Sequence, residues 1–189
     1  QEKEGIKDSP ELLMSDMIKS GLKLNQPQLV RIVAEQSVEI LQWTIEELGV
    51  QYKSTLSHLG GHSVPRTYNT TVTSGSGIIR PMLSKCREQG IPIQLKTFLE
   101  HFIMDENNDI EGVEIREGYI FPNPETGTIK RLRARKAVIL ATGGFSQDKK
   151  FRTIQNPMLT DDIESTNQPG ATAESLIEAI RIGATPIQL

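Results

Sequence analysis

The residues best suited to ligand chemistry lie between Ala137 and Phe145, where five apolar residues precede Thr142, Gly143 and Gly144. A wholly apolar run of this length is typical of a parallel strand buried on both faces, and glycines at its end let the backbone approach a ligand closely. Ligands of open α/β sheets bind beyond the carboxyl ends of the strands. The run is therefore a candidate nucleotide contact, although a Gly-Gly pair alone more often forms a flexible turn.

His62 and Arg66 form a second group of chemically versatile side chains. An imidazole titrates near neutral pH and serves as acid or base, and a guanidinium can hold a carboxylate through two parallel hydrogen bonds. No partner for either side chain is identifiable from the sequence, which favours a hydrogen-bonded structural role for both. The three histidines of the chain do not have the spacing of metal ligands, so no metal site is predicted.

The elements that must position these residues follow from hydrophobic periodicity and capping residues. Helices are expected at about residues 9–21, 28–48, 74–89 and 174–183. In the second helix, a period near 3.6 predicts a core face made of Leu29, Val33, Ile40, Leu41, Ile45 and Leu48. Strands are expected at residues 50–52, 91–95, 98–104, 112–120, 128–135 and 137–141. Residues 54–77 are expected to form a long irregular segment ahead of the third helix.

Composition excludes several classes of protein. The 189 residues contain 21 basic and 24 acidic side chains, and a net charge of −3 provides no basic surface for nucleic acid. No apolar run approaches the roughly 20 residues that span a bilayer, so no transmembrane segment is predicted. The single cysteine, Cys86, excludes an intrachain disulfide and is interpreted as a packed helix residue.

The order of elements, with a three-stranded antiparallel meander followed by Ala141-Thr142-Gly143-Gly144, resembles the FAD-binding domain of flavoproteins related to fumarate reductase. The stretch from Thr166 to Thr172, leading into the last helix, is similar to the second flavin segment of that family. The stretch from Gly60 to Thr67 is similar to its counterpart in the flavocytochrome c-like branch, which includes fumarate, urocanate and methacrylate reductases. The expected fold class is α/β, a partial Rossmann-like domain with parallel strands and the meander inserted between them.

The resemblance implies FAD as cofactor, with backbone amides and small hydroxyls contacting the dinucleotide. It places Ala141, Thr142 and Gly143 along the FAD and Leu99 at the adenine side through its backbone. It places Thr166, Asn167 and Gly170 near the ribityl-pyrophosphate. Where the family has Gly-Asp-Gly, this chain has Ala173-Glu174-Ser175, so Glu174 keeps a carboxylate there. The implied cofactor-binding residues are therefore Leu99, Ala141, Thr142, Gly143, Thr166, Asn167, Gly170 and Glu174.

Other parts of such a flavoprotein are not found in these residues. A dinucleotide fold needs a G-x-G-x-x-G turn at a helix start and an acidic residue further on, and neither is recognisable here. The chain is therefore expected to be the central part, residues 1–189, of one FAD-binding domain. The family's proton-donating arginine and its capping domain would follow it. No catalytic residue is assigned, and little activity is expected from these residues alone.

For the whole protein, the resemblance implies reduction of an activated carbon–carbon double bond in a small unsaturated carboxylate. The electron donor would be a haem domain or cytochrome, and the compartment the bacterial periplasm or, as in other members, the cytoplasm. One alternative is a flavin dehydrogenase or oxidase working in the opposite direction, such as a 3-ketosteroid dehydrogenase. Another is a non-catalytic module that binds a nucleotide or a partner. Unpaired sheet edges would also favour self-association of the isolated chain.

Overall fold

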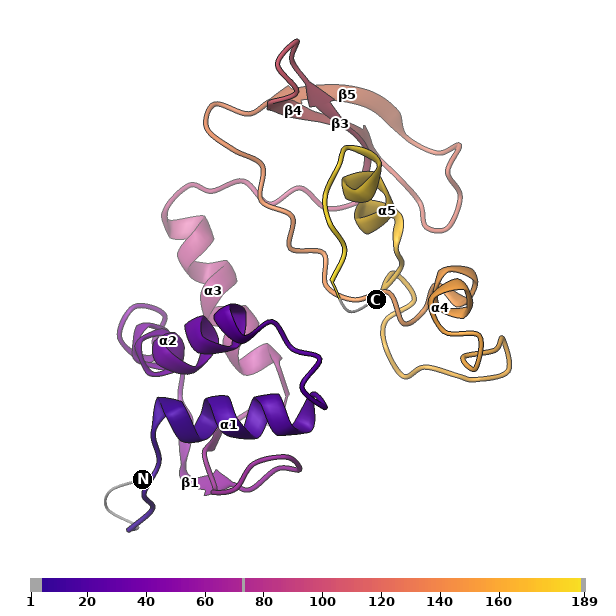
Figure 1. Ribbon diagram of the computed structural model, residues 1–189. Coiled ribbons are helices and arrows are strands. Elements are labelled where there is room, and N and C mark those ends of the chain that lie inside the picture. Colours follow the sequence, from indigo (N-terminus) through magenta and orange to yellow (C-terminus); the bar gives the residue numbers. More distant parts are fainter. Residues whose placement is uncertain (1–4, 73, 188–189) are drawn as a thin grey trace. The chain divides into compact units, whose positions relative to one another are not determined.

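The computed structural model describes residues 5–72 and 74–187. These residues form two compact units, with the division between Ile93 and Gln94 (Figure 1). The first unit contains α1 (Pro10–Ser20), α2 (Pro27–Glu46), β1 (Tyr52–Ser57), β2 (Thr67–Thr70) and α3 (Ser76–Glu88). The second contains β3 (Thr97–Met104), β4 (Ile110–Glu117), β5 (Thr128–Arg133), α4 (Lys149–Gln155) and α5 (Glu174–Arg181). All four expected helices are present, and α4 is an additional one.

The first unit begins with two helices that pack against each other. The hydroxyl of Ser9 accepts a hydrogen bond from the backbone N–H of Leu12 at 3.2 Å, and Pro10 occupies the first turn. A capping hydroxyl satisfies an N–H group that has no partner inside the helix, and proline tolerates that position because its missing N–H would be unpaired there. These residues explain why α1 starts where the sequence predicts.

The buried face of α2 differs from the expected one. Val30, Ala34 and Thr44 are buried, whereas Leu29, Val33, Ile40 and Ile45 are each more than 40% exposed. The Thr44 hydroxyl donates to the backbone carbonyl of Leu41 and lies 2.9 Å from the Tyr52 hydroxyl, so a polar residue occupies the packed side. The periodicity correctly predicted a helix, but the prediction of its core face was wrong. The buried residues Val30, Ala34 and Thr44 have small side chains, which allow the helix to pack closely on this face.

A short hairpin occupies the segment that was expected to be irregular. Strands β1 and β2 pair antiparallel, with Leu56 opposite Tyr68 and Ser57 opposite Thr67. The expected strand at residues 50–52 thus starts at Tyr52 and continues to Ser57. The Ser and Thr content suggested a loop. Threonine, which is β-branched, and tyrosine, which is aromatic, also favour strands, and the two segments pair as a hairpin here.

The second unit is built on the expected meander. Strands β3, β4 and β5 form one antiparallel sheet in that order, with Phe102 opposite Val113 and Val113 opposite Leu132. The polar turn between β3 and β4 is closed by Asp105, whose carboxylate accepts hydrogen bonds from the backbone N–H groups of Asn107 and Asp109. The α/β class and the three-stranded meander are confirmed.

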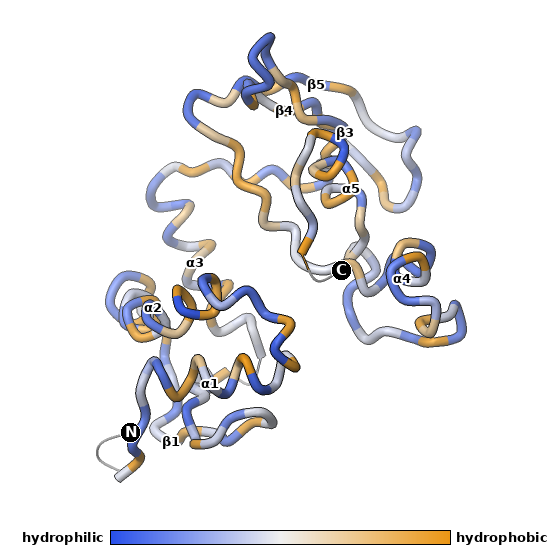
Figure 2. Tube along the Cα trace, viewed as in Figure 1, coloured by the Kyte–Doolittle hydropathy of each residue, from blue (hydrophilic) through white to orange (hydrophobic). Residues whose placement is uncertain are grey.

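The two segments expected as parallel strands, residues 91–95 and 137–141, form no strand in the structure. The second runs between β5 and α4, where the trace has a hydrophobic stretch (Figure 2). Ile139 in it is 88% exposed, and Leu95 in the first is 78% exposed. A parallel strand requires a neighbour on its hydrogen-bonding edge, and the sheets formed by the described residues are antiparallel. These strand predictions therefore fail for the described chain.

Helix α5 contacts β3 and closes the core of the second unit. That core contains Phe102, Ile115, Ala173 and Ala179, together with the buried side chain of Glu178. None of the helices in the described ranges is both long and apolar enough to cross a membrane.

Candidate functional site

A pocket of about 530 Å³ lies within the second unit. One wall is the start of β3, at Thr97, Phe98 and Leu99, and a second wall consists of Tyr119 and Phe121, which follow β4. The third wall combines Thr142 with a stretch that leads into α5. Pockets of this size are typical of sites that bind small molecules and cofactors.

The second wall is aromatic. The ring centroids of Phe98 and Tyr119 are 4.9 Å apart with an interplanar angle of 38°, and those of Tyr119 and Phe121 are 6.5 Å apart. The backbone N–H of Tyr119 donates to the carbonyl of Lys96 at 2.8 Å, which ties this residue to the strand beside it. Sequence reasoning missed the wall, because it forms only when β3 and β4 pair.

The third wall is held by hydrogen bonds between residues 144–148 and residues 165–173. The carboxylate of Asp148 caps α4 by accepting from the N–H of Phe151 at 2.8 Å, and it also accepts from the N–H of Ala173 at 3.2 Å. The backbone N–H of Gln147 donates to the carbonyl of Ala171 at 3.0 Å. These bonds fix the course of the chain just before α5, where Glu174 and Ser175 line the pocket.

Four of the eight predicted cofactor residues line this pocket: Leu99, Thr142, Gly170 and Glu174. Ala141 and Gly143 flank Thr142 in the chain without lining the pocket themselves. Gly143 has a φ of +77°, a conformation that glycine adopts without the strain that a side chain would add. Residues of β3, of the Ala-Thr-Gly-Gly segment and of the last helix thus line one pocket, and their contact with a cofactor stays a prediction.

The other two predicted residues, Thr166 and Asn167, are not in the pocket wall. The carbonyl of Asn167 accepts a hydrogen bond from Gln147 Nε2 at 2.6 Å, and its side-chain amide donates to the Ser146 hydroxyl. Asn167 thus joins the two segments that support the third wall. The sequence held a signal for this support, because Asp148 directly before a helical stretch is typical of an N-cap.

Glu178 fastens α5 to the sheet. Its side chain is only 9% exposed, and its carboxylate accepts hydrogen bonds from Arg181 Nε at 2.8 Å and from the backbone N–H of Phe102 on β3 at 3.2 Å. The hydrogen bond from Arg181, with those from His101 and Phe102, lowers the pKa of Glu178 to about 2 against the opposing effect of burial. The carboxylate therefore stays charged and keeps the first turn of α5 at the pocket.

Arg66 is the centre of a polar cluster in the first unit. Its Nε and Nη2 atoms donate to the two carboxylate oxygens of Asp8 at 3.0 and 2.8 Å, and its Nη1 donates to Asp16 at 2.7 Å. His62 Nδ1 lies 3.3 Å from the same Nη1 atom. The pKa of Asp16 is lowered to about 2, first by the backbone N–H of Ser63 and further by its hydroxyl and Arg66. Arg66 and His62 are thus hydrogen-bonded, as predicted, within the first unit.

Over residues 5–72 and 74–187, no group of three or more histidine, cysteine, aspartate or glutamate side chains is arranged to hold a metal ion. The charged groups around the pocket are therefore considered for hydrogen bonding and electrostatics only.

Comparison with known proteins gives a consistent result. The model of a family described as FAD binding domain matches residues 1–188. The acrylate reductase flavoprotein subunit of Shewanella woodyi is 44% identical over 189 residues, and the urocanate reductase of Eggerthella lenta is 31% identical over 190 residues. Each match covers 100% of this chain but only 37% and 30%, respectively, of the relative. The chain thus spans about a third of the length of these proteins.

Solved structures agree with the sequence matches. The open conformation of a flavocytochrome c3 fumarate reductase superposes with a TM-score of 0.85 and 30% identity, covering 98% of this chain and 31% of the other. A 3-ketosteroid dehydrogenase from Rhodococcus jostii superposes with a TM-score of 0.80 at 18% identity, covering 96% of this chain and 42% of that one. The second likeness concerns the fold alone.

Proposed function

Since this chain belongs to the family of FAD binding domains, we propose that its second unit helps to hold FAD and that the whole protein is a flavin-dependent reductase. The observation that carries the proposal is the convergence of Leu99, Thr142, Gly170 and Glu174, from three separate stretches, on one pocket. We further propose that the two units are central parts of one FAD-binding domain, in keeping with a family match that runs through both.

The residues around the pocket suit FAD on two structural grounds. A Cβ atom added at Gly143, Gly144 or Gly170 would meet no other atom of the protein within 4 Å, so a ligand has open access to the backbone there. The aromatic wall offers a flat apolar surface for a planar ring system. Leu99, Thr142, Gly170 and Glu174 would contact the cofactor directly. Ala141, Gly143, Thr166 and Asn167 are proposed to continue the same site beside them.

When bound, FAD would supply the transfer of a hydride to one carbon of an activated double bond, while a proton reaches the neighbouring carbon. The residues of this chain would bind and orient the cofactor, and we assign none of them to proton transfer. The named substrates of two relatives, acrylate and urocanate, are both unsaturated carboxylates. A small unsaturated carboxylate is therefore the proposed substrate class.

The reduction consumes two electrons, for which we propose a haem domain or a cytochrome as donor. A flavocytochrome among the similar structures supports this assignment. We also propose that the protein is bacterial and lies in the periplasm. The cytoplasm is the alternative compartment.

The test is a titration of the purified protein with FAD, followed by flavin fluorescence and visible absorbance, with FMN and NAD as controls. We expect saturable binding that is selective for FAD. The FAD-loaded protein is then assayed in two ways: with a reduced viologen dye as electron donor and acrylate, fumarate or urocanate as substrate, and with an oxidised dye as electron acceptor and a 3-ketosteroid as substrate. Oxidation of the dye by a carboxylate supports the reductase. Reaction with the steroid and with none of the carboxylates would favour the flavin dehydrogenase over the reductase. Failure to bind FAD would favour the non-catalytic module that binds a partner.

A further inference from the structure

The aromatic wall of the pocket is an ordered feature, and the proposed function does not assign it to any particular part of FAD. Phe98 comes from the start of β3, and Tyr119 and Phe121 follow the end of β4. The 4.9 Å separation of the Phe98 and Tyr119 ring centroids indicates direct packing of the two rings. Tyr119 is half-buried and its backbone is bonded to Lys96, so its ring is held in place before any ligand arrives.

The charge of the pocket restricts what can lie on this wall. Among the described residues that line it, Glu174 is the charged one, and no lysine, arginine or histidine is present. Burial raises the pKa of Tyr119, and the nearby carboxylates of Glu174 and Glu100 raise it further, so the phenol stays neutral. Glu100 is paired with Arg116, so Glu174 is the carboxylate that would repel a negatively charged group on this wall, such as a substrate carboxylate or an anionic reduced flavin.

A neutral planar ring with hydrogen-bond donors at its edge fits both observations. The adenine of FAD is neutral and carries an amino group, and the ribose attached to it carries two hydroxyl donors. An aromatic side chain next to a base contributes stacking, and a carboxylate accepts hydrogen bonds from amino or hydroxyl groups. The isoalloxazine ring presents mainly acceptors at its polar edge, which a carboxylate does not satisfy.

On the basis of the FAD binding proposed above, we propose that Tyr119, backed by Phe98, is the platform on which the adenine ring stacks, and that Glu174 accepts a hydrogen bond from the same adenosine. Tyr119 would then select for the nucleotide half of the cofactor. The pocket is accordingly assigned to the adenosine of FAD and not to the unsaturated carboxylate.

Three variants of Tyr119 separate stacking from packing. Tyr119→Phe keeps the ring, Tyr119→Leu keeps apolar volume without a flat face, and Tyr119→Ala removes both. Tyr68→Ala is the matched control, because Tyr68 also packs on another ring, that of Tyr52, but lies in the first unit. Circular dichroism and thermal unfolding identify any variant that does not fold, and Tyr119→Leu keeps the test decisive if Tyr119→Ala is such a case.

Dissociation constants for FAD, ADP and FMN are measured by calorimetry on the purified protein. We expect Tyr119→Leu to weaken FAD and ADP binding by about tenfold, the loss typical of one aromatic–base stack. Tyr119→Phe and Tyr68→Ala should stay within about twofold of the unmodified protein, and FMN binding should not respond to Tyr119. The adenine H2 and H8 resonances of bound ADP should shift upfield in the unmodified protein and in Tyr119→Phe, and this ring-current shift should be lost in Tyr119→Leu.

The outcomes are distinguishable. If FAD binds the unmodified protein and Tyr119→Leu equally well, the adenine platform is wrong while the flavoprotein assignment stands. If Tyr119→Leu weakens FMN and leaves ADP unchanged, the wall faces the flavin ring and the proposal is overturned. If the unmodified protein binds no FAD, the proposed function fails and this inference fails with it.

Discussion

The Nδ1 atom of His101 on β3 lies 3.1 Å from the Oε1 atom of Glu178 on α5. Arg181 and the backbone N–H of Phe102 donate to the same carboxylate, so one buried acid joins helix to sheet. Glu174, at the first turn of this helix, lines the pocket. The position of the pocket wall therefore depends on a side chain that does not itself touch the pocket.

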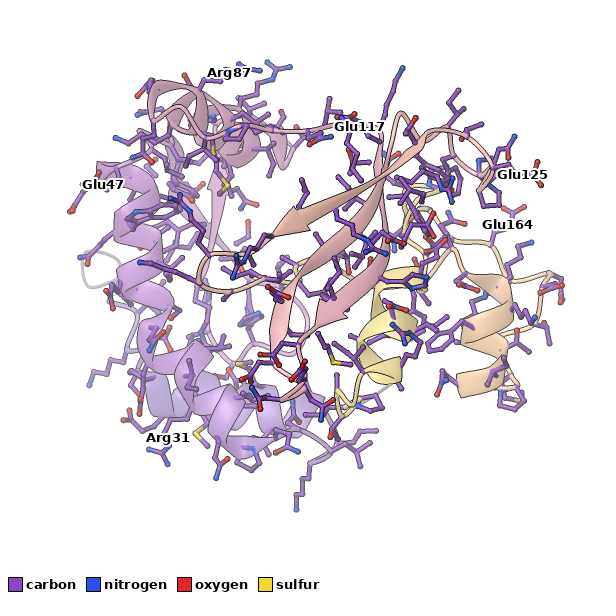
Figure 3. All side chains as sticks on the ribbon, turned by 90° about the horizontal axis from the view of Figure 1, so that it is seen from above. Arg31, Glu47, Arg87, Glu117, Glu125 and Glu164 are labelled. Carbon is purple, nitrogen blue, oxygen red and sulfur yellow. The ribbon has the colours of Figure 1, made fainter. Side chains whose placement is uncertain are left out.

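Replacing Glu178 by alanine should loosen this junction. The change leaves Arg181 without its partner and the N–H of Phe102 unsatisfied, which we expect to cost about 2 kcal/mol of stability, because Arg181 is half exposed and can be solvated. FAD affinity should fall with it. Chemical denaturation and FAD titration provide the measurements, and Glu164→Ala, at an exposed glutamate (Figure 3), is the control. Equal effects of the two substitutions would show that the junction does not support the site.

The same carboxylate predicts a dependence of stability on pH. Folding lowers the pKa of Glu178 from its ordinary 4.5 to about 2, so its contribution is complete above pH 4.5 and is lost as the pH falls toward 2. Glu178→Gln should flatten the loss of stability between pH 4.5 and 2. Thermal unfolding at several pH values measures this slope, and an unchanged slope in the variant would contradict the assignment. Asp16, whose pKa is also lowered to about 2, maintains a residual slope.

Arg66→Lys should weaken the first unit although the charge is kept. A lysine has a single ammonium group and cannot make the paired bonds to Asp8 together with the bond to Asp16. We expect a lower melting temperature and faster amide hydrogen exchange in residues 60–66. Arg31→Lys is the matched control, because Arg31 lies at the outside of α2 with a 63% exposed side chain and a single 3.5 Å partner. Similar exchange in both variants would mean that the cluster does not hold this loop.

Gly143→Ala should be more harmful than Gly144→Ala. Both positions have room for a methyl group, but only Gly143 has a positive φ, at which a side chain adds about 1 kcal/mol of strain. Relief of that strain would turn the backbone after Thr142 and should lower FAD affinity. Denaturation and FAD titration of the two variants are compared directly. A larger loss for Gly144→Ala would show that steric access, not backbone conformation, governs this segment.

Local signals predicted much of the fold. Ser9 and Pro10 marked the start of α1, and the polar residues around Asp105 marked the turn of the meander, because caps and turns depend on residues close in sequence. The packed face of α2 was missed, since it is decided by the elements that lie opposite and not by periodicity, and Val30 and Ala34 are buried while larger residues of the helix are exposed. The run at residues 137–141 has the composition of a buried strand, but pairing also needs a neighbour.

Some residues of the candidate site could also be predicted from the sequence, and others could not. Resemblance to a family named Leu99, Thr142, Gly170 and Glu174 as cofactor residues, and the structure shows that these four line one pocket. Composition alone left Gly143 and Gly144 as an ambiguous turn. Tyr119 was not predicted, because its packing on Phe98 depends on the register of two strands and on the chain beyond β4. Long-range pairing, which a single sequence does not specify, accounts for what was missed.

Arg152 shows how a loop can vary in sequence while keeping its course. Its guanidinium is buried and donates to the backbone carbonyls of Ser146, Thr160 and Ile163. Every residue type has such a carbonyl, so the side chains at these three positions are free to change without loss of these contacts. Thr160 and Ile163 can therefore be replaced over evolution without loss of the course of this loop, whereas Arg152 is the residue that tolerates replacement least.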